Sequence, residues 1–173
     1  YELTTLPRRL AVIGAGPIGA ELAQSFQRFG SQITLFDMLP QVLGREDSEA
    51  AAVVQKSLAR DGVAMRLGMA IKEVKSAETH KIIVYEQDGQ LFEHETDEIL
   101  LAVGRAPNIE GLNLEAAGVE ANRRQVIVND KLQTSNRSIY AAGDVCTYAG
   151  KLKLIATGVG EAAIAVNNAV HRI

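Results

Sequence analysis

A glycine-rich turn between an apolar strand and a helix constrains the fold of this chain more than any other feature. The strand is predicted over residues 9–13, and the helix begins at Pro17, where a missing N–H is tolerated. Between them, Gly14, Gly16 and Gly19 have the spacing G-x-G-x-x-G. The first glycine permits a tight turn, the second lets a ligand approach the backbone, and the third lets helix and strand pack closely.

The same turn predicts a dinucleotide-binding site. N–H groups at a helix N-terminus, at the positive end of the helix dipole, bind a pyrophosphate. A second strand, predicted over residues 32–36, closes a βαβ unit, and Asp37 follows it, 18 residues after Gly19. A carboxylate at that position accepts hydrogen bonds from the adenosine ribose. The predicted cofactor-binding residues of this unit are Gly14, Gly16, Pro17, Ile18, Gly19 and Asp37.

Asp37 also favours NAD over NADP. The extra phosphate of NADP would bring like charges together, with about 4 kcal/mol of repulsion per pair at about 4 Å and an effective dielectric of about 20. The residues that follow, Met38, Leu39 and Pro40, supply no cation, and Arg45 is the only nearby candidate. We therefore expect NAD, with NADP as the alternative.

The rest of the chain predicts an antiparallel insertion and a return to parallel strands. A helix is predicted over 46–60, short strands over 63–66, 71–74, 82–85 and 91–94, and a buried parallel strand over 98–103. Asp88 and Gly89 predict a hairpin turn. Beyond a loop-rich stretch with a helical turn near 114–117, two strands are predicted over 126–128 and 138–141, and a helix over 160–172. The expected fold class is α/β: a Rossmann-like βαβ with a central parallel sheet and an inserted antiparallel β-meander, in three layers.

Charge, hydropathy and cysteine content argue against several functional classes. A net charge of −3 disfavours nucleic acid or an anionic membrane as a partner. No apolar run approaches the roughly 18–20 residues that span a bilayer, and no signal peptide opens the chain. The single cysteine, Cys146, excludes an intramolecular disulfide and favours a cytoplasmic location. The histidines His80, His94 and His171 are scattered, so we expect no metal site, and no set of catalytic side chains is predicted.

Three stretches together resemble the FAD-dependent pyridine nucleotide-disulfide oxidoreductases, the family of dihydrolipoamide dehydrogenase, mercuric reductase and glutathione reductase. They are "GAGPIGAELAQSFQRFG" at 14–30, "ILLAVGRAPN" at 99–108 and "TSNRSIYAAGDV" at 134–145. In that family an FAD fingerprint comes first, a second fingerprint opens the NAD(P)H domain, and an A-x-G-D stretch returns the chain to the FAD domain. The resemblance covers residues 8–145 and implies that the glycine-rich turn here is the nicotinamide fingerprint, although its place near the start of the chain suggests flavin.

The resemblance also implies roles for residues outside that turn. Glu21 resembles the glutamate near the nicotinamide carboxamide, and Gly104 the glycine beside the nicotinamide half, while Arg105 and Pro107 fix the loop. Gly143 and Asp144 resemble the pair whose aspartate binds the FAD ribityl chain. Residues 7–130 are accordingly expected to form an NAD(H)-binding domain, and residues 131–173 a partial return segment of an FAD-binding domain.

The tail resembles a different branch, the thioredoxin-reductase-like ferredoxin–NAD(P) reductases. The stretch "GDVCTYAGKLKLIATGVGEAAIAVNNAV" carries this resemblance. It implies that Lys153, Leu154 and Thr157 lie near an isoalloxazine. Body and tail thus point to two branches of flavoproteins.

The chain lacks much of the flavin-binding part of the family's motif pattern. The chain has no first G-x-G-x-x-G and no cysteine pair. We expect an NAD(H)-binding domain or truncated fragment of a flavin-dependent oxidoreductase, with hydride transfer from NADH to FAD in the intact parent and little or no turnover by itself. The alternatives are a non-catalytic NAD(H)-sensing or docking module, a self-contained dehydrogenase, and a flavoprotein fragment whose turn binds FAD. Homo-oligomerisation through exposed surface is a further hypothesis.

Overall fold

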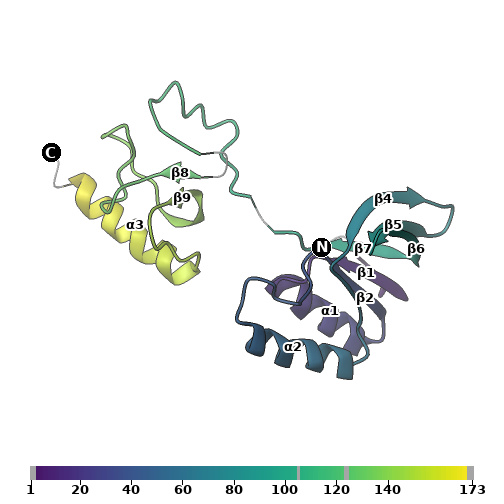
Figure 1. Ribbon diagram of the computed structural model, residues 1–173. Helices are drawn as coiled ribbons and strands as arrows, with labels where there is room; N and C mark the ends of the chain where they lie inside the picture. The colour runs from purple at the N-terminus through teal and green to yellow at the C-terminus, as the bar shows by residue number, and fades with distance from the viewer. Residues whose placement is uncertain (1–2, 105, 123–124, 171–173) are drawn as a thin grey trace. The chain divides into compact units, whose positions relative to one another are not determined.

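The computed structural model describes residues 3–104, 106–122 and 125–170, and the chain forms two compact units, Tyr1–Gly104 and Arg105–Ile173. Arg105 and His171 lie outside the described residues, as does the predicted end of the last helix. The division falls at Gly104, whereas the boundary expected at residue 130 separates two cofactor-binding functions. That functional boundary stays a prediction. Figure 1 shows the elements of each unit.

A parallel sheet of four strands forms the centre of the first unit. Its order is β3-β2-β1-β7, in which β1 is Arg9–Ile13, β2 is Gln32–Asp37, β3 is Ala64–Leu67 and β7 is Glu98–Leu101. All three pairings are parallel, and Val12 of β1 lies opposite both Leu35 and Leu100. The carboxyl ends of β1 and β2 therefore lie side by side, which places the turn after β1 next to Asp37.

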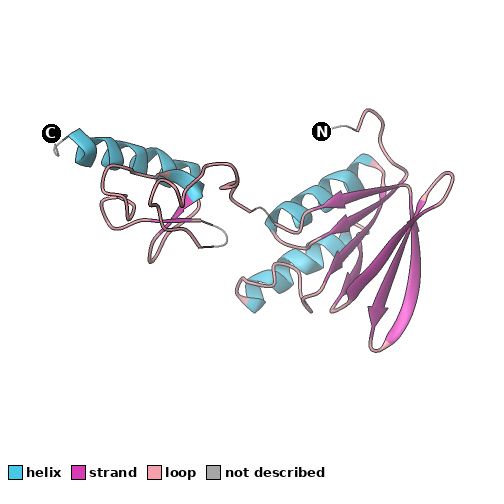
Figure 2. Ribbon diagram, turned by 90° about the horizontal axis from the view of Figure 1, so that it is seen from above, coloured by secondary structure: helices cyan, strands magenta, loops and turns pink. Residues whose placement is uncertain are grey.

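Two helices cover one face of this sheet, as Figure 2 shows. Helix α1 is Pro17–Phe29 and ends at Gly30, whose φ of 107° is the left-handed conformation typical of a helix C-cap. Helix α2 is Ser48–Arg60 and begins after Asp47. Buried apolar residues of the sheet and helices form the core between them; they include Leu10, Val12, Ala20, Ala23, Leu35 and Leu58.

An antiparallel sheet covers the opposite face of the parallel sheet (Figure 2). Its order is β4-β5-β6, with β4 Ala70–Ser76, β5 Lys81–Gln87 and β6 Gln90–Thr96. Asp88 and Gly89 form the predicted hairpin turn with φ values of 53° and 75°. A second buried cluster, Ala11, Phe36, Met69, Ile83 and Tyr85, joins the two sheets. The expected α/β class, with its Rossmann-like βαβ, inserted meander and three layers, is confirmed.

Two expectations for the first unit need correction. The strand predicted over 98–103 ends at Leu101 and lies at the edge of the sheet of this unit, so Leu101 is 72% and Val103 71% exposed within the described residues. A continuous apolar run predicts a strand covered on both faces, but among the described strands β7 pairs with β1 alone and its last residue, Leu101, is not covered by the layers of this unit. The helix predicted from residue 46 begins at Ser48, because Asp47 accepts hydrogen bonds from the first-turn amides and so ends the preceding loop.

The second unit is small and mostly irregular. It contains a two-stranded parallel pair, β8 Val126–Ile127 and β9 Cys146–Thr147, a 3₁₀ turn η1 at Gly143–Val145, and helix α3 at Ile155–Val170. Buried residues of the loops, strands and helix form its core: Val119, Val126, Val128, Leu132, Cys146 and Ala165. The helical turn predicted near 114–117 is present as a hydrogen-bonded turn at 114–118.

Two predictions for the second unit are wrong. Residues 138–141 form no strand, because Tyr140 makes only an isolated antiparallel bridge to Gln133 and the chain turns back at once through Asn136. The last helix begins at Ile155 rather than Gly160, since two glycines in its first turns do not prevent helix formation. In the part of the chain that the structure describes, no helix has the length and apolar character needed to cross a membrane.

Candidate dinucleotide site and the turn at Gly143

The glycine-rich turn is held by close backbone contacts that exclude side chains at two of its positions. Gly14 has a φ of +103°, and its N–H donates to the carbonyl oxygen of Phe36 at 2.7 Å. A Cβ at Gly14 would lie 2.5 Å from the carbonyl oxygen of Ala102, and one at Gly19 would lie 1.8 Å from the carbonyl oxygen of Gly14. The turn therefore packs against both helix α1 and the segment that follows β7.

Gly16 is different, because neither its conformation nor the protein around it requires a glycine. Its φ of −68° and ψ of −177° are open to any residue, and a Cβ there would meet no protein atom within 4 Å. The space in front of Gly16 is thus outside the protein core, at the point where α1 begins. A glycine at this position leaves the backbone open to close approach by a ligand.

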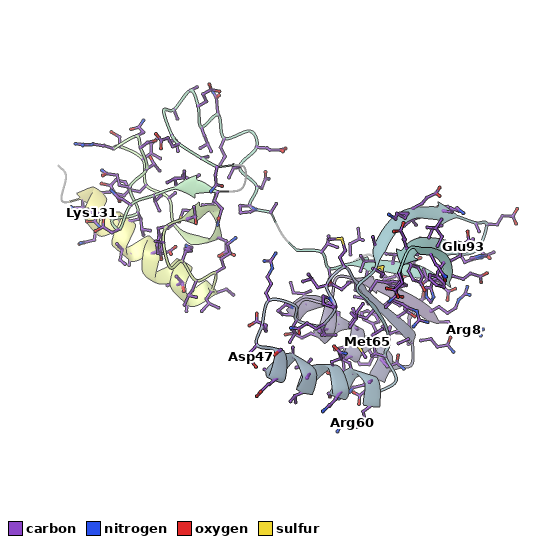
Figure 3. The ribbon with its side chains drawn as sticks, in the orientation of Figure 1. Arg8, Asp47, Arg60, Met65, Glu93 and Lys131 are labelled. Atoms are coloured by element: carbon purple, nitrogen blue, oxygen red, sulfur yellow. The ribbon has the colours of Figure 1, made fainter. Side chains whose placement is uncertain are left out.

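The N-terminus of α1 carries no cap of its own. No side chain accepts a hydrogen bond from its first amides, and its first turn contains no acidic residue. Helix α2 shows the contrast: Asp47, labelled in Figure 3, accepts from the amides of Glu49 and Ala50 at 3.0 and 3.1 Å. Of the two helices in this unit, only α1 leaves the positive end of its dipole without an anionic partner among the described residues. Pro17 and Ile18 lie exposed there.

Asp37 lies at the carboxyl end of β2 and binds the loop that follows β1 and the loop that follows β2. Its Oδ2 atom accepts from the amide of Ala15 at 2.6 Å, and its Oδ1 atom accepts from the amide of Leu39 at 2.8 Å. The first bond joins the carboxylate directly to the glycine-rich turn. Each oxygen retains a further lone pair, so the half-buried carboxylate can still accept hydrogen bonds from ligand hydroxyls.

A shallow groove of about 340 Å³ runs between α1, α2 and the loop before α2. Glu21 and Glu46 line its rim, and Ala20 and Leu58 are part of its apolar lining. Gly104 has a φ of +110° and does not line this groove. The structure therefore brings the glycine-rich turn, Asp37 and the segment through Ala102 together, while Glu21 lines the groove between the helices and Gly104 does not.

In the second unit, Gly143 and Asp144 form the 3₁₀ turn that precedes β9. Gly143 has a φ of +80°, and Asp144 is exposed. The amide of Gly143 donates to Oε2 of Glu161 at 2.7 Å, and its carbonyl oxygen accepts from Nζ of Lys151 at 2.8 Å. Both backbone groups of this glycine are therefore bound by charged side chains.

Lys151 and Glu161 form a buried ion pair that sequence reasoning missed. Their closest atoms are 2.5 Å apart, and their side chains are 4% and 5% exposed. Burial alone would raise the pKa of the Glu161 carboxyl, but hydrogen bonds from Lys151, from the Tyr148 hydroxyl at 2.7 Å and from Gly143 hold that pKa below its usual value. Burial would likewise lower the pKa of Lys151, yet its hydrogen bond to Glu161 and its proximity to Cys146 raise it. Both groups stay charged near neutral pH.

Cys146 belongs to the core of the second unit. Its thiol is fully buried and donates to the carbonyl oxygen of Gly143 at 3.3 Å, and burial is the main cause that raises its pKa. Lys153 and Leu154 are exposed just before α3, and Thr157 lies in the first turn of that helix. No group of three or more His, Cys, Asp or Glu side chains is arranged to hold a metal ion within residues 3–104, 106–122 and 125–170.

Known proteins resemble this chain over most of its length but extend well beyond it. It is 41% identical over 145 residues to a mercuric reductase of Staphylococcus aureus, which covers 83% of this chain and 26% of that protein. It is 42% identical over 143 residues to a dihydrolipoyl dehydrogenase of Thermus scotoductus, covering 81% of this chain and 31% of that protein. The chain therefore spans about a quarter to a third of the length of these curated relatives.

Solved structures share the fold. A water-forming NADH oxidase from Lactobacillus brevis, solved bound to NADH, superposes with a TM-score of 0.80 at 28% identity and covers 95% of this chain and 37% of its own. The sequence model of one protein family, the pyridine nucleotide-disulphide oxidoreductases, matches residues 1–168. The chain belongs to the pyridine nucleotide-disulphide oxidoreductase family.

Proposed function

We propose that residues 7–130 bind NAD(H) and that residues 131–173 contribute part of an FAD-binding domain. The chain would then be the NAD(H)-binding portion of an FAD-dependent oxidoreductase. The observation that carries the proposal is the uncapped N-terminus of α1 beside the open approach at Gly16. A pyrophosphate there would accept from first-turn amides and complement the helix dipole.

The residues around this turn fit the remaining parts of the dinucleotide. The amides of Ile18 and Gly19 are first-turn donors that no capping side chain binds, and Pro17 starts the helix without an N–H to satisfy. Asp37 would accept from the adenosine ribose through its remaining lone pairs. We assign Glu21 and Gly104 to the nicotinamide half on the strength of the family resemblance.

NAD is the preferred form in this proposal. The Asp37 carboxylate would repel the extra phosphate of NADP by about 4 kcal/mol per charge pair at close range before screening. Met38, Leu39 and Pro40 carry no charge to offset this repulsion. The similarity to an NADH oxidase solved with NADH supports the same choice.

In a longer protein that holds both cofactors, NADH and a flavin would together supply the chemistry of hydride transfer. Gly143 and Asp144 would contribute to the flavin site, with the exposed Asp144 carboxylate accepting hydrogen bonds from the ribityl hydroxyls. No side chain of this chain is assigned a catalytic role, because the protein's part in such a transfer is to bind and align the two cofactors. The electron acceptor is not assigned.

Two further proposals concern the cellular location of the protein and its association with other chains or chain segments. The single cysteine favours the cytoplasm. Exposed apolar residues on α3, among them Ile155 at 91%, favour association of copies of the chain or of chain segments that cover this helix.

Titration with NADH and NADPH on the wild type and on Asp37→Asn tests the proposed function. We expect the wild type to bind NADH several-fold more tightly, and the ratio of the two dissociation constants to approach one in Asp37→Asn. Asp47→Asn is the matched control, because it changes an aspartate of the same unit that serves only α2 and keeps a good cap. Equal affinity of the wild type for both nucleotides, or no binding of either, would overturn the assignment.

A further inference from the structure

The buried ion pair of the second unit is joined to one residue of the backbone from two sides. Glu161 accepts the Gly143 amide at 2.7 Å, and Lys151 donates to the Gly143 carbonyl oxygen at 2.8 Å. The two side chains approach Gly143 from different parts of the chain, since Lys151 lies in the loop after β9 and Glu161 lies on α3. Together they fix the orientation of the peptide groups on both sides of Gly143.

We propose that Lys151 and Glu161 are positioning residues that clamp the turn at Gly143 so that the neighbouring Asp144 carboxylate is presented to a polyhydroxylated ligand, the ribityl chain of a flavin. This inference rests on the proposed flavin site at Asp144. The ligand contact itself belongs to Asp144, and the ion pair acts through the backbone that carries it.

The ion pair satisfies backbone polar groups of the turn, which apolar side chains could not do. Burying two charges is costly, and well-packed apolar side chains often give equal or greater stability. The turn, however, has two backbone polar groups that point into the interior, and an apolar pair would leave both unsatisfied. The carboxylate accepts the N–H and the ammonium donates to the C=O, so the charges match the polarity of the peptide groups.

The surroundings leave this clamp little freedom. The Tyr148 hydroxyl donates to Oε1 of Glu161 at 2.7 Å, which occupies the carboxylate oxygen that faces away from Gly143. The Cys146 thiol donates to the same Gly143 carbonyl that Lys151 binds. A Cβ at Gly158 of α3 would lie 3.3 Å from the Gly143 Cα, so the start of the helix also contacts the turn. Asp144 nevertheless remains exposed to a ligand.

A double-mutant cycle on FAD binding, followed by quenching of flavin fluorescence on the whole chain, tests the proposal. Asp144→Asn is expected to weaken FAD binding about tenfold or more, as loss of a hydrogen bond to a charged group does. Glu161→Gln is expected to weaken FAD binding about fivefold or more when Asp144 is intact. In the Asp144→Asn variant the same change is expected to weaken FAD binding less than about twofold. Lys131→Met, which removes an exposed lysine of the same unit (Figure 3), is expected to change neither value. Equal effects of Glu161→Gln in both backgrounds would contradict the clamp.

Amide hydrogen exchange at Gly143 tests the clamp without flavin. Exchange of this amide is expected to be about tenfold faster or more in Glu161→Gln than in the wild type and Lys131→Met, while the Val126 amide of β8 keeps its rate. Unchanged exchange at Gly143 would overturn the clamp. Faster exchange without any FAD binding by the wild type would keep the clamp but overturn the flavin site, so the two failures are distinct. Lys151→Arg, which retains the charge, serves as the milder variant if Glu161→Gln does not fold.

Discussion

Replacing the second and third glycines of the turn by alanine should separate ligand binding from folding. At Gly19 a Cβ would lie 1.8 Å from the carbonyl oxygen of Gly14, where real contacts stay above 3.0 Å. The oxygen belongs to the backbone and the position of a Cβ is fixed by the backbone, so no rotamer change relieves the overlap. At Gly16 a Cβ would meet no protein atom within 4 Å, and the φ of −68° suits alanine. The first variant perturbs the protein, and the second fills space where a ligand is proposed to lie.

The magnitudes follow from this geometry. Gly19→Ala must move α1 away from the turn, and overpacking against backbone is expected to cost about 3 kcal/mol of unfolding free energy. For a unit of this size, that corresponds to a decrease of about 12–24 °C in the melting temperature. Gly16→Ala should change stability by less than about 0.5 kcal/mol, because a weaker N-cap is offset by a less flexible unfolded chain. Its methyl group would clash with a pyrophosphate by about 1–3 kcal/mol, a loss of about 5- to 150-fold in NADH affinity.

Thermal unfolding and isothermal titration with NADH on the two variants measure these effects. The expected result is a stable Gly16→Ala with weak NADH binding and a destabilised Gly19→Ala. Wild-type NADH affinity in a folded Gly16→Ala would exclude a pyrophosphate at this helix terminus, because such a ligand leaves no room for the added methyl group. Unchanged stability of Gly19→Ala would show that the close packing of α1 on the turn is not required.

Three other expectations concern stability. Asp47→Ala should lower the unfolding free energy of the first unit by about 1 kcal/mol through loss of the α2 cap, with unchanged NADH affinity in a titration. Lys151→Met should cost about 3–5 kcal/mol in chemical denaturation, because it leaves the buried Glu161 carboxylate without its cation. The folded-state pKa of Glu161 lies below its unfolded value, so its contribution is complete above about pH 4.3 and is lost as the pH falls through the folded-state pKa. Unfolding of the second unit monitored from pH 7 to pH 2 should show this loss in the wild type and little of it in Glu161→Gln.

The parts of the fold that could be predicted are those set by short-range rules. The strand Arg9–Ile13 is bounded by polar residues and the turn, and helix α1 is bounded by Pro17 and Gly30, so both were predicted with their observed limits. The steric need for glycine at positions 14 and 19 also follows from the spacing, because strand and helix must approach closely there. For the strand, the helix and Gly19 the decisive neighbours are near in sequence, whereas Gly14 also packs against Ala102, which is distant in sequence.

The features that sequence reasoning missed depend on residues distant in sequence. Asp37 was predicted to bind a ribose, but its bond to the Ala15 amide needs the register of β1 and β2. Lys151 and Glu161 were not singled out, because only the packing of α3 on the turn at Gly143 brings them together and buries them. A charged pair in a stretch otherwise rich in small and apolar residues was the available signal. The edge position of β7 likewise depends on which strands surround it.

Backbone amide NMR during titration with NADH tests most directly whether the N-terminus of α1 is the nicotinamide dinucleotide site. We expect the largest shifts on the amides of Gly16, Ile18 and Gly19 and on the Leu39 amide bound to Asp37, with the Gly143 turn unaffected. Shifts centred on Gly143 and Asp144, or no shifts at saturating NADH, would contradict this site.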